Sequence, residues 1–394
     1  EKIEKTLDFE ILPNPVLTSI EPLKGYVGAT VTVVAENLGT IAKEDIQMMF
    51  GETPATDITI VDESTFTVKV PSLTTFGEIP LSMTIHGVEM NMGGYAAFEI
   101  LASPVITSVE TDNKFSSKAV QVGNTVTIKG TGFRNSTISS ATFGGQDLNY
   151  TVVSDTEITA SVSEQCAEGE DVITFKFDDV VVDVVSSDKL NMLKAGSDIS
   201  DYILTNVKQP FESKEGKTSG HCTPVGWKFN YGAGNDGFCH NESEIEMPGE
   251  GLYMNDQGGL LVIQSGWEVR SKKMNGKMFQ IFNIPQGIYD VVIDVAELAT
   301  SGGGRKKAGL FISKGGEEQT PNMDASGNWT ENTNLLKSVD FYKLGETYNE
   351  NYKDRRFVIE NLTIDYEGET TLGFAVHFDS NRALKISSIK VLLK

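Results

Sequence analysis

The chain has 394 residues, 33 of them basic and 55 acidic, and its formal net charge at pH 7 is −22. This length exceeds what one hydrophobic core serves, so we expect two or three domains. A strongly acidic surface repels phosphate backbones and anionic membranes, which argues against nucleic acid as a partner and leaves neutral ligands open. No apolar run approaches the roughly 20 residues that span a bilayer. No basic-then-apolar leader is present, so we expect that any signal peptide has been removed or never existed.

Short apolar runs alternate with clusters of Gly, Asn, Asp, Ser and Thr along the whole chain. Residues 29–39, 124–133 and 288–298 are rich in Val, Ile and Thr and alternate with period two, which predicts strands. Helical periodicity is nearly absent, and only residues 188–204 could hold one short helix. These patterns predict an all-β protein, most simply one built from sandwiches.

An internal repeat fills the first half of the chain. One copy begins with "PVLTSIEP" at Pro15 and the other with "PVITSVET" at Pro104. Both copies contain a Phe-Gly pair, followed by an alternating strand over 64–71 in the first copy and 156–163 in the second. A repeated unit of about 90 residues with many short strands is the size of an immunoglobulin-like sandwich.

The first copy has a regular pattern of Pro, Gly and apolar residues, formed by Pro15, Ile20, Pro22, Gly25, Gly28, Val31, Phe50, Gly51 and Pro71. This pattern resembles the IPT/TIG immunoglobulin-like family. The second copy departs from the pattern at Thr111 and Ser163, where the first has prolines, and it carries the insertion "NKFSSKA".

The last 200 residues do not repeat this pattern, and they contain all three tryptophans. Residues 259–269, 277–298 and 370–393 are the clearest predicted strands, and Pro285 and Gly287 supply turn chemistry between two of them. This part resembles galactose-binding-like jelly rolls, in which two strands flank a tight Pro-Gly turn and the last strand returns beside the first. We therefore predict two tandem Ig-like (IPT/TIG) sandwiches followed by a larger β-sandwich or jelly roll.

The whole layout resembles the cell-surface glycan-binding lipoproteins of starch-utilisation-type uptake systems. The resemblance implies a non-catalytic protein on the outer membrane, anchored by an N-terminal lipid outside this sequence. It also implies a neutral polysaccharide as ligand, with an outer-membrane glycan transporter complex as a further partner. The domains implied are a linker at 1–12, IPT/TIG domains at 13–102 and 103–195 as spacers, and a carbohydrate-binding jelly roll at 196–394.

Aromatic side chains in the last domain are the candidate ligand contacts, because a sugar ring can lie flat on an indole or phenol face. Each of them could instead be core, and Trp227 in particular alternates with Phe229 and Tyr231, so all three would share one face of a strand. Trp329 lies in a polar loop, where an indole exposes apolar area unless something covers it. The predicted binding residues are Trp329, Trp227, Tyr231, Trp267, Asn235, Asp236 and Asn328.

Several roles are compatible with the adjacent pairs His221–Cys222 and Cys239–His240. Zinc is disfavoured, because adjacent residues on a strand point to opposite faces. A Cys222–Cys239 disulfide is a workable alternative in an oxidising compartment and would leave Cys166 over. No cofactor is expected, although Asn- and Asp-rich loops are compatible with a structural calcium ion. A protein-binding scaffold and a glycoside hydrolase remain as other functions, the second requiring two facing carboxylates.

Overall fold

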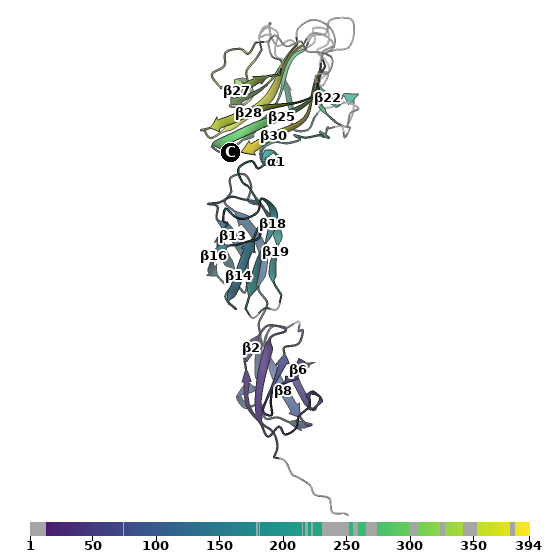
Figure 1. The fold of residues 1–394 in the computed structure, drawn as a ribbon, viewed down its shortest axis with the longest axis vertical. Helices are drawn as coiled ribbons and strands as arrows, with labels where there is room; N and C mark the ends of the chain where they lie inside the picture. Colours follow the sequence, from purple (N-terminus) through teal and green to yellow (C-terminus); the bar gives the residue numbers. More distant parts are fainter. Residues whose placement is uncertain are drawn as a thin grey trace, which may run out of the picture. The chain divides into compact units, whose positions relative to one another are not determined.

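The protein is described from a computed structural model, in which two compact units are separated at Met192 and Leu193. Each unit is described by itself (Figure 1). The structure describes residues 13–73, 75–178, 180, 182–214, 216, 220–221, 224–230, 252–254, 259–264, 274–299, 306–323, 328–341, 353–378 and 383–394.

The first Ig-like sandwich consists of two sheets. Its four-stranded sheet has the order β1-β3-β7-β6, and its second sheet has the order β2-β10-β8-β4-β5 with β9 added to β8. Its core includes Phe50 and Phe98, whose rings meet edge to face with 5.1 Å between their centroids. The strands are β1 (Val16–Glu21), β2 (Lys24–Gly25), β3 (Thr30–Glu36), β4 (Ile46–Phe50), β5 (Thr53–Pro54), β6 (Thr56–Ile60), β7 (Thr65–Lys69), β8 (Gly77–Ile85), β9 (Val88–Glu89) and β10 (Ala97–Ile100), with short 3-10 turns η1 (Lys43–Asp45) and η2 (Gly93–Tyr95).

The second Ig-like sandwich repeats this connectivity, with sheet orders β11-β13-β17-β16 and β12-β19-β18-β14-β15. Gly130 in β13 is required sterically, because a Cβ there would lie 1.9 Å from the Val105 carbonyl oxygen. The strands are β11 (Val105–Thr111), β12 (Ala119–Val120), β13 (Val126–Thr131), β14 (Ile138–Phe143), β15 (Gln146–Asp147), β16 (Asn149–Ser154), β17 (Glu157–Ser161), β18 (Gly169–Phe177) and β19 (Val184–Met192).

The repeat extends to single side chains on the four-stranded sheets. In each sheet a cross-strand row of one glutamate and three threonines, here called the threonine row, runs over the outer face. In both copies the two central threonines are half-buried and the two end residues are exposed. The rows are Glu21, Thr32, Thr67 and Thr59 in the first sandwich, and Glu110, Thr127, Thr159 and Thr151 in the second.

The C-terminal sandwich is larger and is also built from two antiparallel sheets. One sheet has the order β20-β22-β23-β30-β25-β28 and the other β21-β24-β29-β26-β27; Figure 1 shows β25, β28 and β30 side by side. The elements are α1 (Ser200–Ile203), β20 (Gly220–His221), β21 (Lys228–Asn230), β22 (Leu252–Met254), β23 (Leu261–Gln264), β24 (Met274–Asn283), β25 (Gly287–Ala299), β26 (Lys306–Lys314), η3 (Glu317–Gln319), β27 (Leu335–Asp340), β28 (Lys353–Ile364), β29 (Glu369–Phe378) and β30 (Ala383–Leu393).

A chain of aromatic rings joins the two C-terminal sheets. Phe374 on β29 packs on Trp227 and on Phe341, and Phe341 packs on Phe357 of β28 with 4.7 Å between the ring centroids. The face of the five-stranded sheet that carries Phe374 is therefore the inner one, and its opposite face is the outer one.

The last strand closes the domain beside its first residues. Backbone hydrogen bonds join β30 to residues 196–209, including the bonds from the Ile199 N–H to the Val391 carbonyl and from the Ile389 N–H to the Val207 carbonyl. Residues 196–209 form isolated bridges to β30 but no named strand, and the first named strand of this sandwich, β20, pairs with β22.

The predicted fold class is confirmed, with two tandem Ig-like sandwiches and a larger β-sandwich. Of the possible helix at 188–204, only Ser200–Ile203 is helical, because Val184–Met192 is paired in a sheet as β19. Within the described ranges, no helix has the length and hydropathy needed to cross a lipid bilayer.

Candidate functional site

The candidate site lies on the outer face of the five-stranded sheet. Residues paired across antiparallel strands point to the same face, and one cross-strand row there contains Lys277, Ala375, Gly309 and Asp340 in that order. Ala375 and Gly309 have little or no side chain, whereas Lys277 and Asp340 carry charges. The row continues beyond Lys277 to Asn230 of β21. Lys277, Ala375 and Gly309 are buried, and Asp340 is exposed.

Trp329 lies over the Gly309 and Asp340 end of this row. Its indole Nε1–H donates to Asp340 Oδ1 at 2.8 Å, and its ring meets Phe311 edge to face with 6.1 Å between the centroids. A Cβ on Gly309 would come within 2.7 Å of Trp329 Cζ2, so the ring can lie this close to the strand only because residue 309 is glycine. The indole is half-buried, and Asn328 beside it is exposed.

The described residues 315–323 and 328–334, here called the roof loop, lie between β26 and β27 in the sequence and include Trp329. At its start, the Gly315 N–H donates to the Glu369 carbonyl and Thr371 Oγ1 donates to the Gly315 carbonyl. At its end, the Asn334 carbonyl accepts from the Lys314 N–H of β26 at 2.8 Å. Both ends of the loop are therefore fastened.

The roof loop also folds back on itself around Trp329. The Thr330 N–H donates to the Asn322 carbonyl at 2.8 Å, and Met323 and Trp329 form an isolated antiparallel bridge. Met323 is buried in a small cluster with Phe279, Phe311 and Ala375, against which Trp329 and Leu335 pack. This cluster lies on the outer face of the sheet and gives the indole an apolar underside.

Lys277 holds the middle of the roof loop from below. Only 5% of its surface is exposed, and its Nζ donates to Asn322 Oδ1 at 3.0 Å, to the Thr320 carbonyl at 3.4 Å and to Thr320 Oγ1. Burial lowers the pKa of Lys277 to about 8, and the negative charge of Glu317 opposes that shift. Lys277 is thus a cation in this row that contacts the roof loop, and Asp340 in the same row is the partner of the indole.

The structure corrects the prediction that Trp227 contacts ligand. Trp227 is only 5% exposed, its ring stacks on Phe374 at 5.9 Å, and its Nε1–H donates to the Asn206 carbonyl at 3.0 Å. A ring enclosed on the inner face has no surface left for a sugar. The alternation of Trp227 with Phe229 marks a core-facing strand, which is the alternative that the sequence left open.

Several predicted residues lie outside the described residues. They are Tyr231, Trp267, Asn235 and Asp236 among the candidate ligand contacts, together with both members of the Cys222–Cys239 disulfide prediction. These predictions remain predictions. Cys166 is described and is a buried free thiol in the second Ig-like sandwich.

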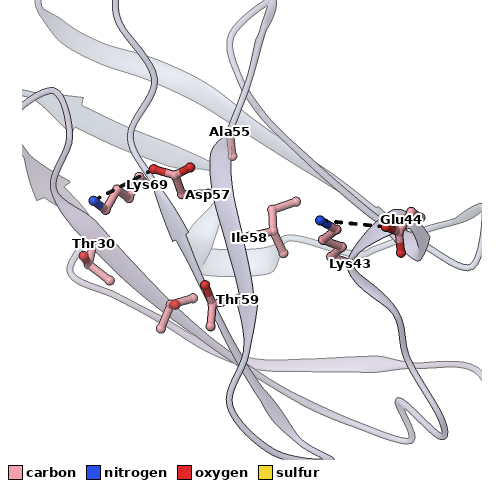
Figure 2. A pocket seen from close by; sticks show the side chains of 9 residues that line it. Thr30, Lys43, Glu44, Ala55, Asp57, Ile58, Thr59 and Lys69 are labelled. Carbon is pink, nitrogen blue, oxygen red and sulfur yellow. Dashed lines mark ion pairs between the residues drawn. The ribbon is translucent and has the colours of Figure 1, made fainter.

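A hollow of about 780 Å³ lies on the first Ig-like sandwich, around β6 and η1 (Figure 2). Its charged residues are paired with one another, Lys69 with Asp57 at 3.9 Å and Lys43 with Glu44 at 4.0 Å. The side chains of Asp57 and Glu44 are each 71% exposed. Water already solvates these groups, so the hollow offers a ligand little that bulk solvent does not.

The described residues give little evidence of a metal site or of acid–base catalysis. No group of three or more His, Cys, Asp or Glu side chains there is placed to hold a metal ion. Hydrogen bonds lower the pKa of each described carboxyl group that departs from its ordinary range, with Ser64, Val109, Lys394 and Arg356 as the respective leading donors. A glycosidase acid requires the opposite shift. The carboxyl groups concerned are those of Asp62, Asp188, Asp290 and Asp294.

Comparison with protein families identifies the first two sandwiches. Residues 15–99 and 104–188 each match the IPT/TIG domain, so the chain contains two IPT/TIG domains in tandem. The assignment of the second copy holds despite Thr111 and Ser163, because its strand order and the β-bulge in its first strand follow those of the first copy. A comparison with curated proteins found no match.

Solved structures similar to this chain include surface glycan-binding proteins and a carbohydrate-binding module, all of low identity. The SGBP-B protein from a complex xyloglucan utilisation locus in Bacteroides uniformis is 14% identical, with 97% of this chain and 100% of that chain covered at a TM-score of 0.21. The module TmCBM61 in complex with β-1,4-galactotriose is 13% identical, with 43% and 90% covered at a TM-score of 0.25. The extracellular region of plexin A4 is 13% identical, with 56% and 19% covered at a TM-score of 0.31, so this chain spans about a fifth of it. No functional argument follows from scores of this size.

The sequence named Trp329 and Asn328 as candidate contacts but not the residues that position the indole. Gly309 interrupts the apolar run 308–312, and a glycine inside a strand marks a close approach by another group, so that signal was available. Lys277 and Asp340 carried no local signal. Their role depends on strand register, which places residues far apart in sequence in one cross-strand row.

Proposed function

We propose that the protein is a non-catalytic glycan-binding protein whose C-terminal sandwich binds a neutral polysaccharide. One observation carries the proposal: the half-buried indole of Trp329 is held over Gly309 by Asp340, with the exposed amide of Asn328 beside it. A fixed aromatic face with amide groups near it suits a pyranose, whose C–H face stacks on the ring while its hydroxyls form hydrogen bonds. No catalytic group or metal is needed for such binding.

In this proposal the two IPT/TIG domains are spacers. Their outer faces carry the threonine rows and no tryptophan. In the hollow on the first domain, each charged side chain is paired with another that lines the same hollow. We further propose that the chain is displayed at a bacterial cell surface through an N-terminal lipid on a segment outside this sequence. A glycan transporter complex in the outer membrane would be its partner. Labelling of intact cells with an antibody against the C-terminal sandwich tests the location.

Affinity electrophoresis against a panel of neutral polysaccharides tests glycan binding. Xyloglucan, mixed-linkage glucan and β-1,4-galactan belong in the panel, because the similar proteins are named with these glycans or their oligosaccharides. We expect at least one polysaccharide to retard the protein. Trp329→Ala should weaken that binding about tenfold or more, since an aromatic contact contributes roughly 0.5–1.5 kcal/mol beyond burial.

The matched control is Phe76→Ala, which removes an aromatic ring that is 59% exposed on the first IPT/TIG domain. We expect this variant to bind as the unmodified protein does. Retardation by none of the polysaccharides, or equal retardation of both variants and the unmodified protein, would remove the basis for the proposal.

A further inference from the structure

We propose that Lys277 is a positioning residue for Trp329: its buried ammonium ties the roof loop to the five-stranded sheet and thereby sets the place of the indole. The consequence for ligand binding rests on the proposed function, whereas the consequence for the indole itself does not. Lys277 is on β24 and Trp329 is on the roof loop, so sequence distance alone gives no reason to connect them.

The hydrogen-bond acceptors around Lys277 suit a charged amine. An ammonium has three N–H donors and no acceptor, and the structure places three oxygens around Lys277 Nζ, two from Thr320 and one from Asn322. Thr320 Oγ1 in turn donates to the Glu317 carbonyl. The cation is therefore held by polar atoms of the roof loop, and the loop is held by the cation.

The Asn322 contact continues to the indole through the residue next to it. The backbone carbonyl of Asn322 accepts from the Thr330 N–H, and Thr330 Oγ1 accepts from the Asn322 N–H at 3.2 Å. Trp329 precedes Thr330 and bridges to Met323, which follows Asn322. A shift of Asn322 thus moves the strand-like pair that carries Trp329, while Asp340 holds the far edge of the ring.

The charge state of Lys277 determines how well its hydrogen bonds can hold the roof loop to the sheet. The neutral amine has two N–H groups and a lone pair, and the lone pair would face one of the three oxygens. Because burial brings the pKa of Lys277 to about 8, the tie is complete at pH 7 and weakens above pH 8. Placement of Trp329 should therefore change at mildly alkaline pH.

Other charged and titratable groups face the same region. The roof loop contributes Glu317, β29 contributes His377 on the outer face, and β26 contributes Lys307 opposite His377. On β21, Asn230 pairs with Lys277 and carries no charge, whereas the charged Lys228 pairs with Phe279. Because the pKa of Lys277 is about 8, the informative window runs from pH 7.5 to 9.5.

Fluorine NMR of the full chain labelled with 5-fluorotryptophan tests the proposal without any ligand. The Trp329 resonance is assigned as the one that is lost in Trp329→Phe. We expect its chemical shift to change with a midpoint near pH 8, and this change to be absent in Lys277→Met. The control Lys228→Met removes an exposed lysine from the same side of the same sheet and should keep the pH-dependent shift.

Binding to the retarding polysaccharide is then measured over the same pH window. We expect the unmodified protein to lose about fivefold in affinity between pH 7.5 and 9.5, and Lys277→Met to be weak and independent of pH. A Trp329 resonance that stays constant in the unmodified protein, or that titrates equally in Lys277→Met, would overturn the positioning role. If the resonance behaves as expected but no glycan binds, the proposed function fails and the positioning role stands.

Discussion

The outer faces of the sheets differ between the IPT/TIG domains and the C-terminal sandwich. In the IPT/TIG domains the threonine rows present β-branched side chains that cover their own strands and remain open to water. In the C-terminal sandwich the corresponding outer face has Ala375 and Gly309 in the middle of its row, and the roof loop with Trp329 lies over it. Removal of side chains from a sheet surface is thus what makes room for an aromatic ring there.

The two described tryptophans give the largest contrast within the C-terminal sandwich. Trp227→Ala should destabilise this domain by about 3–5 kcal/mol, because it empties a fully enclosed site on the inner face. Trp329→Ala should cost less, since that ring is only half-buried. All three tryptophans lie in the last 200 residues, so tryptophan fluorescence during urea unfolding reports on this domain alone. Equal losses for the two variants would contradict the assignment of the two rings to different environments.

Gly309→Ala should have the next largest effect, because its new Cβ meets both Trp329 Cζ2 at 2.7 Å and the Val339 carbonyl oxygen at 2.8 Å. We expect a loss of about 1–3 kcal/mol in unfolding free energy together with a displaced Trp329 resonance. The control Gly94→Ala adds a methyl group where nothing lies within 4 Å and should change stability by about 0.5 kcal/mol or less. If Gly309→Ala changes neither the unfolding free energy nor the Trp329 resonance, the indole does not require a glycine at residue 309.

Asp294 on the six-stranded sheet should have a moderate effect that depends on pH. Its carboxylate accepts from Arg356 Nε at 2.7 Å and from Ser388 Oγ at 2.7 Å, and these bonds, the one from Arg356 first, lower the pKa of Asp294. The stabilisation is therefore present above the unfolded-state pKa of about 3.9 and is lost as the pH falls through the folded-state value.

Asp294→Asn should accordingly cost about 1 kcal/mol at pH 7, a figure reduced for solvent screening because Arg356 is 65% exposed. Urea unfolding at pH 7 and at pH 3 measures this difference. The difference in unfolding free energy between the variant and the unmodified protein should be smaller at pH 3. A difference that is the same at both pH values would show that the stabilisation does not depend on the ionisation of Asp294.

The threonine rows should give the smallest effects. Thr67→Ala and Thr159→Ala each remove one member of a cross-strand pair and should cost about 0.5 kcal/mol, as measured by circular dichroism during unfolding. Neither variant should alter retardation by a polysaccharide. A loss of glycan binding in either one would assign ligand contact to the IPT/TIG domains and contradict their role as spacers.

Much of the fold could be predicted from the sequence because its signals are local. Alternation located β3, β13 and β25, and the turn chemistry of Pro285 and Gly287 separated β24 from β25. The candidate site was only partly predictable. Trp329 stood out in a polar loop, but the same reasoning placed Trp227 near the ligand, because one strand face looks alike whether it points to a core or to water. Lys277 and Asp340 become neighbours of the site only through sheet register, which no short stretch of sequence encodes.

The hydrogen bonds between β30 and residues 196–209 bear on how the C-terminal sandwich can be separated for study. A fragment that starts at residue 210 would leave one side of its final strand without the partners that Ile199 and Val207 supply. An unpaired strand side of that kind is prone to pair with other chains and aggregate. A separable unit should therefore begin before Gly196 and keep the chain's last residue, Lys394, whose amine binds Asp290 at 2.6 Å.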